Sequence, residues 1–132
     1  MTATKAPSAQ LPFSVGVVNH IGFTIGTEAA NAISVVIQFK DALADSSARA
    51  SLMMYVSGDA NGDTIIGTAP TSIVIGTDGL LIPLVAGKTF LVTSESDGDV
   101  DITLGVVGAA TYYLVFVLPD GSLVVSSAIT FA

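Results

Sequence analysis

Residues 33–40 read ISVVIQFK, and this stretch decides the fold class because its hydrophobicity alternates with a period of two residues. The odd-numbered positions are Ile, Val, Ile and Phe, whereas the even-numbered positions include Ser, Gln and Lys. Because successive side chains of a strand point to opposite sides, the pattern predicts a strand with one face in a core and the other face nearer to water.

The same alternation recurs along the chain, and no window of 12 or more residues keeps apolar positions at helical spacing between caps. About nine short strands joined by turns predict an all-β fold, an Ig-like antiparallel β-sandwich with an extended N-terminal arm. The expected strands are residues 15–25, 33–40, 51–56, 73–75, 80–85, 89–93, 100–104, 111–118 and 123–131.

Turn residues separate these strands. The sequence PDGS at 119–122 predicts a hairpin between the last two strands, because Pro presets φ and Gly accepts a positive φ. TDG at 77–79 and DGD at 97–99 predict two further turns. The segment at 42–50 is short and rich in Ala, Asp and Ser, so we expect a loop there. The β-branched and aromatic residues at 112–117 predict a central strand.

The start of the chain differs from the rest. Residues 1–12 hold little to bury and contain Pro7 and Pro12, so we expect an extended arm, followed by a sandwich domain over residues 13–132. An unstructured terminus is the alternative.

Just after the arm, Leu11, Phe13, Val15 and Val17 alternate with smaller residues. As a partner interface, this segment would add a strand to the sheet edge of a neighbouring subunit. As an ordinary first strand, it would pack inside its own sandwich. Both interpretations stay open at this point.

Charge and composition restrict the partners. The chain has eleven acidic and four basic residues, a formal net charge of −7, and only 11% charged residues. The basic residues are scattered, so neither nucleic acid nor an anionic membrane surface is expected to bind. With no cysteine, a disulfide framework or a Cys-based zinc site is excluded. Other proteins, including copies of this chain in a homo-oligomer, are the expected partners.

Reactive side chains are scarce. His20 is the single histidine, and a catalytic role would require a nucleophile and an orienting acid beside it. No nucleophile elbow, zinc-binding helix or phosphate loop is present in the sequence. We therefore expect no enzymatic activity, no catalytic residues and no cofactor.

Two acidic clusters raise the question of calcium. Asp59, Asn61 and Asp63 lie at alternate positions, and so do the aspartates at 97, 99 and 101. The first cluster begins like a calcium loop, but Gly62 occupies the fourth position of that loop rather than the sixth, and Pro70 occupies the twelfth, where a Glu is needed. Solvated turns are the simpler interpretation, and no metal site is predicted.

From residue 33 onward the chain resembles bacterial Ig-like domains of the intimin and invasin type. The resemblance lies in the strand ending FKDA at 39–42, a strand at 50–57, TDGL at 77–80 and the closing hairpin over 112–131. Residues 43–45, Leu-Ala-Asp, replace the Gly and Pro that usually follow the Lys-Asp of that family. The resemblance implies the sandwich and carries no site residues over.

The whole chain is also similar to small structural proteins of tailed bacteriophages, in SGDANGD at 57–63, IGTDGL at 75–80, residues 95–101 and the ending 118–131. This resemblance implies a virion protein made in the host cytoplasm, a capsid decoration, cement or head-fibre subunit that binds the major capsid protein or other virion proteins. The alternative function is an adhesion module of a phage fibre or bacterial surface that binds a host glycan.

Overall fold

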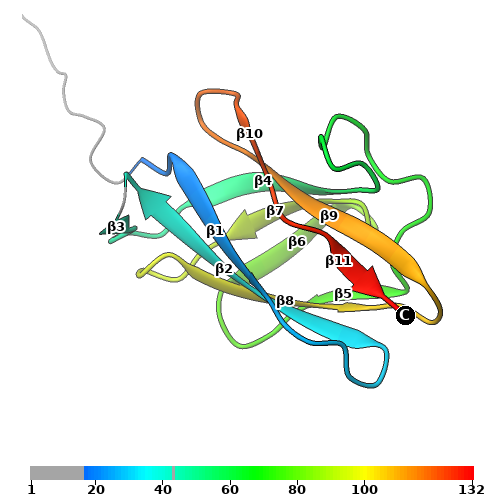
Figure 1. The fold of residues 1–132 in the computed structure, drawn as a ribbon. Coiled ribbons are helices and arrows are strands. Elements are labelled where there is room, and N and C mark those ends of the chain that lie inside the picture. Colours follow the sequence, from blue (N-terminus) through cyan, green and yellow to red (C-terminus); the bar gives the residue numbers. More distant parts are fainter. Residues whose placement is uncertain (1–16, 43) are drawn as a thin grey trace, which may run out of the picture.

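The computed structural model describes residues 17–42 and 44–132. Within these residues there are strands and connections but no helix, and two antiparallel sheets pack face to face (Figure 1). The predicted all-β antiparallel sandwich is therefore confirmed. It also follows that, over the described part of the chain, no helix has the length and hydrophobicity needed to cross a membrane.

The first sheet has the order β1-β2-β8-β5. These strands are β1 (His20–Ile25), β2 (Ala32–Asp41), β8 (Asp99–Gly105) and β5 (Ser72–Ile75). The two-residue strand β3 (Ala44–Asp45) pairs with the end of β2. The sheet is thus bounded by β1 on one side and β5 on the other.

The second sheet has the order β10-β9-β4-β7-β6. Its strands are β10 (Leu123–Val125), β9 (Ala110–Val117), β4 (Ser51–Ser57), β7 (Thr89–Thr93) and β6 (Leu80–Val85). A further strand, β11 (Ile129–Phe131), pairs with the first half of β9, and β10 pairs with its second half. As predicted, β9 is a central strand.

The spatial order parallels the two sheets of a variable-type Ig sandwich, in which strands A-B-E-D face strands G-F-C-C′-C″. The path of the chain through the middle differs. After β4, the chain crosses to β5 in the first sheet and only then forms the β6–β7 hairpin. As a result, β7 rather than the next strand in sequence lies beside β4.

The core fills the space between the sheets with the inward residues of both. On β2 the burial alternates as expected, with Val35 and Ile37 fully buried. Phe39 of β2 meets Phe116 of β9 edge-to-face, with 5.5 Å between ring centroids. The contact between β2 and β9, the two strands with the clearest sequence patterns, therefore packs the two sheets together.

Most of the predicted strands are confirmed to within one or two residues. The hairpin turn at 119–122 is also confirmed, since the amide of Leu118 donates to the carbonyl of Ser122 and Gly121 has a φ of 86°. Two strand predictions are corrected. The first described strand begins at His20, and the single strand predicted over 123–131 is two strands, β10 and β11.

Ser126 causes the second correction. Its Oγ accepts a hydrogen bond from the amide of Leu114 at 3.0 Å, and its own amide donates to the carbonyl of Leu114. The hydroxyl thus takes the place of a backbone carbonyl in the ladder, so the chain continues beside β9 while the regular pairing is interrupted. Among the described residues 42 and 44–50, the chain forms a loop as expected, apart from β3.

The predicted arm over residues 1–12, and Leu11, Phe13 and Val15 of the predicted interface, lie outside the described residues. Val17 is described and is 40% exposed. The next residue, Val18, is buried in the core, and the amide of Asn19 donates to the carbonyl of Lys40. The chain is therefore anchored to the sandwich from Val18 onward.

Candidate functional site

The outer faces of the two sheets differ in chemistry. On the first sheet, the outward positions are mainly polar, as expected for an antiparallel sheet with one solvated face. They include Ser34, Gln38 and Lys40 of β2, Asp99, Asp101 and Thr103 of β8, and Thr24 of β1. Val36 is the exception on β2, where it is 45% exposed.

The outer face of the second sheet carries a continuous row of apolar side chains, one from each of five neighbouring strands. We call Ile82, Leu91, Met53, Val117 and Leu123 the apolar row. Each member is the direct cross-strand partner of the next, with Ile82 opposite Leu91, Leu91 opposite Met53, Met53 opposite Val117, and Val117 opposite Leu123. At about 4.8 Å between strands, the row is about 19 Å wide.

This row is open to solvent at its middle and at both ends. Met53 is 46% exposed, Ile82 40% and Leu123 43%, whereas Leu91 and Val117 are partly buried between their neighbours. Single exposed apolar residues are common on protein surfaces, but a contiguous exposed group is typical of an interaction site. The row is therefore the candidate functional site of the described chain.

On one side, polar side chains limit the row. In the neighbouring cross-strand pair, the hydroxyls of Ser51 and Thr93 are hydrogen-bonded at 2.7 Å. On β6, Leu80 and Leu84 are 51% and 53% exposed and extend the apolar surface along that strand.

On the other side, a loop of the chain itself covers the sheet. Gly62 lies against Val115 and Val125, and the hydroxyl of Tyr55 donates a hydrogen bond to the carbonyl of Gly62. Val115 is fully buried as a result, although it points outward from β9. The fold thus covers one part of this face and leaves the apolar row uncovered.

The aspartates at 97, 99 and 101 have structural contacts. The Asp101 carboxylate accepts hydrogen bonds from the amides of Thr77 and Asp78 at 2.8 and 2.7 Å, so it holds the turn before β6. Asp97 accepts a hydrogen bond from the amide of Asp99. Burial, together with the charges of neighbouring aspartates, raises the pKa of Asp99.

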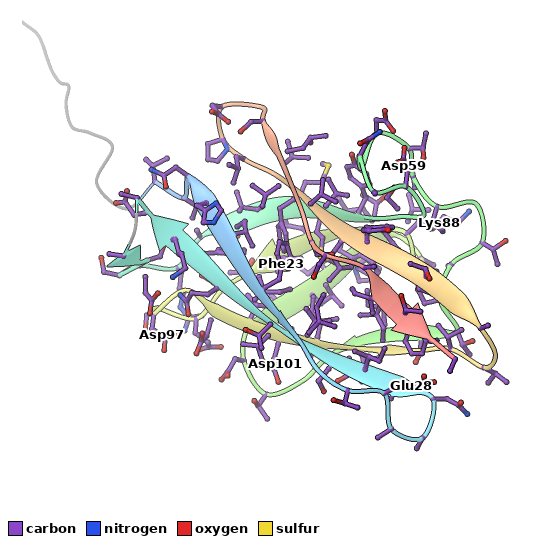
Figure 2. All side chains as sticks on the ribbon, in the orientation of Figure 1. Phe23, Glu28, Asp59, Lys88, Asp97 and Asp101 are labelled. Atoms are coloured by element: carbon purple, nitrogen blue, oxygen red, sulfur yellow. The ribbon has the colours of Figure 1, made fainter. Side chains whose placement is uncertain are left out.

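Asp59, Asn61 and Asp63 lie on a different loop, well away from Asp97 and Asp101 (Figure 2). The Asp59 carboxylate accepts a hydrogen bond from the amide of Asn61. A side-chain hydrogen bond between the two carboxyls lowers the pKa of Asp59 and raises the pKa of Asp63. Among residues 17–42 and 44–132, no group of three or more His, Cys, Asp and Glu side chains could hold a metal ion.

Two residues singled out from the sequence, Val17 and His20, lie just before and at the start of β1. Of the predicted interface, Val17 alone falls in the described part of the chain, where it is exposed beside the start of β1. His20 is exposed at the first position of β1. The structure therefore leaves the proposed role of Leu11, Phe13 and Val15 as a prediction.

Sequence reasoning missed the apolar row, although a signal for it was present. The strands SLMMYVS and LLIPLV have apolar residues on both faces, unlike the alternating strand ISVVIQFK. A strand that is apolar on both faces needs cover on both. The sequence could not show that the outward residues of five strands align in one register.

Comparisons with known protein families, curated proteins and solved structures found no match to this chain.

Proposed function

We propose that this protein is a structural subunit of a virion, a capsid decoration, cement or head-fibre protein that binds neighbouring capsid proteins through the apolar row. The observation that supports the proposal most directly is the contrast between the two outer faces. An apolar sheet face of this width is disfavoured in water, so it favours a partner surface that excludes water from it.

Two further features support an assembly role. The outward positions of the second sheet carry no charged side chain, and the chain as a whole is only 11% charged, so docking on this face would require little desolvation of ions. The similarity of the stretches at 57–63, 75–80 and 95–101 to tailed-phage structural proteins, and of residues 33–131 to bacterial Ig-like domains, supports the virion context. In a symmetric particle, many copies of a modest contact would add up to stable attachment.

The test uses particles made from the genome that encodes this chain. Mass spectrometry of purified particles should detect the chain, and electron microscopy should show its density at equivalent surface positions. Particles produced without the chain should bind the purified protein when it is added back.

A matched pair of variants then tests the face. Met53→Lys places a charge in the apolar row, whereas Val36→Lys places the same charge at a residue of similar exposure, 45% against 46%, on the outer face of the other sheet. Met53→Lys should weaken particle binding at least tenfold, and Val36→Lys should bind like the unaltered protein. Absence of the chain from particles, or equal binding by both variants, would contradict the proposal.

A further inference from the structure

A second apolar surface opens at one side of the sandwich, between the strands that end the two sheets. It is a groove of about 420 Å³ between β5 of the first sheet and β6 of the second. We call it the edge groove. Its apolar lining includes Ile73, Ile75, Leu81, Pro83 and Phe90.

Both strands beside the groove have unpaired backbone edges within the described residues. β5 pairs with β8 on one side, β6 pairs with β7 on one side, and neither has a second neighbour among residues 17–42 and 44–132. On β6, Pro83 and the adjacent register shift interrupt the backbone edge, which disfavours pairing with a further strand. β5 has no proline between Ser72 and Ile75, so it is the edge that can accept another strand.

The chain contains a segment with the pattern that such a site requires. In residues 11–15, LPFSV, the apolar side chains of Leu11, Phe13 and Val15 would share one face of an extended strand. The backbone groups of these alternate residues also point to one side of the strand. Pro12, which lacks an N–H, then falls on the side that faces away from the pairing edge.

Charge also permits this contact. Residues 1–16 contain Lys5 and no acidic residue, whereas all eleven acidic residues lie in residues 17–132. The segment therefore carries no charge that the acidic sandwich would repel.

A molecule cannot insert this segment into its own groove. Val18 is buried, and the amide of Asn19 donates a hydrogen bond to the carbonyl of Lys40. Lys40 lies near the end of β2 that is distant from Ile33. Ile33 lies in the same cross-strand row as Ile73. Three strand spacings from β1 to β5, combined with seven residue steps along β2, give about 27 Å from the start of β1 to Ile73, and with five steps they give about 22 Å to Ile75.

The available chain is too short to cover either distance. Phe13 is five residues before Val18, which allows a reach of at most about 18 Å. Figure 1 shows the start of β1 and strand β5 at opposite ends of the sandwich. Phe13 can therefore enter an edge groove only in another molecule.

We propose that residues 11–15 of one copy add as a strand to β5 of a second copy and place Leu11, Phe13 and Val15 in its edge groove. The contact is head-to-tail, because donor segment and acceptor groove are different surfaces, so it propagates into a ring or a filament. The inference rests on the proposed assembly role and names the contact between copies of the chain, whereas the apolar row serves the contact with capsid proteins.

The experiment uses the full chain and two complementary variants. Phe13→Asp disables the donor segment and leaves the groove intact, and Ala86→Trp fills the groove from an exposed turn position and leaves the donor intact. Light scattering after size-exclusion chromatography should show concentration-dependent oligomers for the unaltered chain and monomers for each variant alone. An equimolar mixture of the two variants should form heterodimers and nothing larger, because only one donor and groove pair is functional.

Ser14→Asp is the matched control, since it adds the same charge on the opposite face of the segment. It should oligomerise like the unaltered chain, whereas Phe13→Asp should stay monomeric even at tenfold higher concentration. If Ala86→Trp still associates, Ile73→Asp, checked for folding by circular dichroism, blocks the groove from within.

Four results would each overturn this inference: a full chain that stays monomeric, association that survives Phe13→Asp, association that survives both groove variants, or heterodimers that fail to form on mixing. The outcome is separate from the particle test. A monomeric chain that binds particles through Met53 would contradict the head-to-tail contact and leave the proposed function standing. An oligomer that never binds particles would contradict the proposed function and leave the head-to-tail contact standing.

Discussion

Gly62 illustrates how a single residue determines which part of a sheet face is covered. It has a φ of 70°, and a Cβ at this position would lie 2.7 Å from Val125 and 2.9 Å from Val115. We expect Gly62→Ala to destabilise the fold by about 1 to 3 kcal/mol, through the strained backbone and the displaced loop. Chemical denaturation measures the effect.

Gly121→Ala is the control for the backbone contribution alone. Gly121 also has a positive φ, 86°, but no atom lies within 4 Å of its Cβ position. Its substitution should cost about 1 kcal/mol. Equal losses for the two variants would mean that the contact with Val115 and Val125 contributes nothing.

Asp99 should make the folded state less stable as the pH rises. Its pKa is raised above the usual 3.8, first by burial and then by the charges of Asp97, Asp78, Asp45 and Asp101. Between 3.8 and the raised pKa, the folded state holds more protons than the unfolded state, so stability falls as the pH increases through that window. Asp99→Asn should therefore raise the melting temperature at pH 7, and the gain should disappear near pH 3.

Asp120 provides a control of opposite sign. Hydrogen bonds from the side chain and the backbone of Ser122 lower the pKa of Asp120, so its contribution to stability is present above pH 3.8 and is lost as the pH falls through the lowered pKa. Asp120→Asn should lower the melting temperature at pH 7 and have little effect near pH 2. Changes in melting temperature of the same sign for Asp99→Asn and Asp120→Asn at pH 7 would contradict the opposite directions of the two pKa shifts.

At the scale of the element, Ser126 decides how the last part of the chain pairs with β9. Its hydroxyl accepts the Leu114 amide at 3.0 Å and donates to the carbonyl of Ser127 at 2.9 Å. Ser126→Ala leaves the Leu114 amide in the core without a partner, so we expect a loss of about 1 to 3 kcal/mol. Ser127→Ala, at the exposed neighbouring position, should change the free energy of unfolding by less than about 0.5 kcal/mol.

Amide hydrogen exchange gives an independent measurement at this position. The Leu114 amide should exchange faster in Ser126→Ala than in Ser127→Ala, because its acceptor is lost. Unchanged protection of that amide would show that another group takes the place of the hydroxyl.

At the scale of the whole molecule, the adjacent residues Met53 and Met54 test which face of β4 lies in the core. Met54 is fully buried between the sheets, whereas Met53 is 46% exposed in the apolar row. Met54→Ala should cost about 2 to 5 kcal/mol of folding free energy. Met53→Ala should cost less than about 0.5 kcal/mol, because folding does not bury that side chain completely.

Denaturation of both variants under the same conditions checks this prediction. A large loss for Met53→Ala would mean that the face is covered in solution by part of the same chain. In that case the apolar row would belong to the fold and would not be available to a partner.

Local chemistry made the strands and several turns predictable from the sequence. ISVVIQFK alternates because one side of β2 must be apolar and the other wet, and PDGS forms a turn because Pro and Gly favour the required φ values. These preferences act within a few residues, so they do not depend on what lies across the sheet. The position of Asp101 was less predictable, since its partners, Thr77 and Asp78, are more than twenty residues away.

The sequence by itself determined the all-β class, the approximate bounds of most strands and the scarcity of reactive side chains, because the two-residue period and the composition are local properties. The tertiary structure alone decided that Ile82, Leu91, Met53, Val117 and Leu123 form one row, and that β5 and β6 enclose a groove. Both surfaces arise from the register and order of strands that are far apart in sequence. Long-range pairing fixes that order, and the period of a single strand carries no information about it.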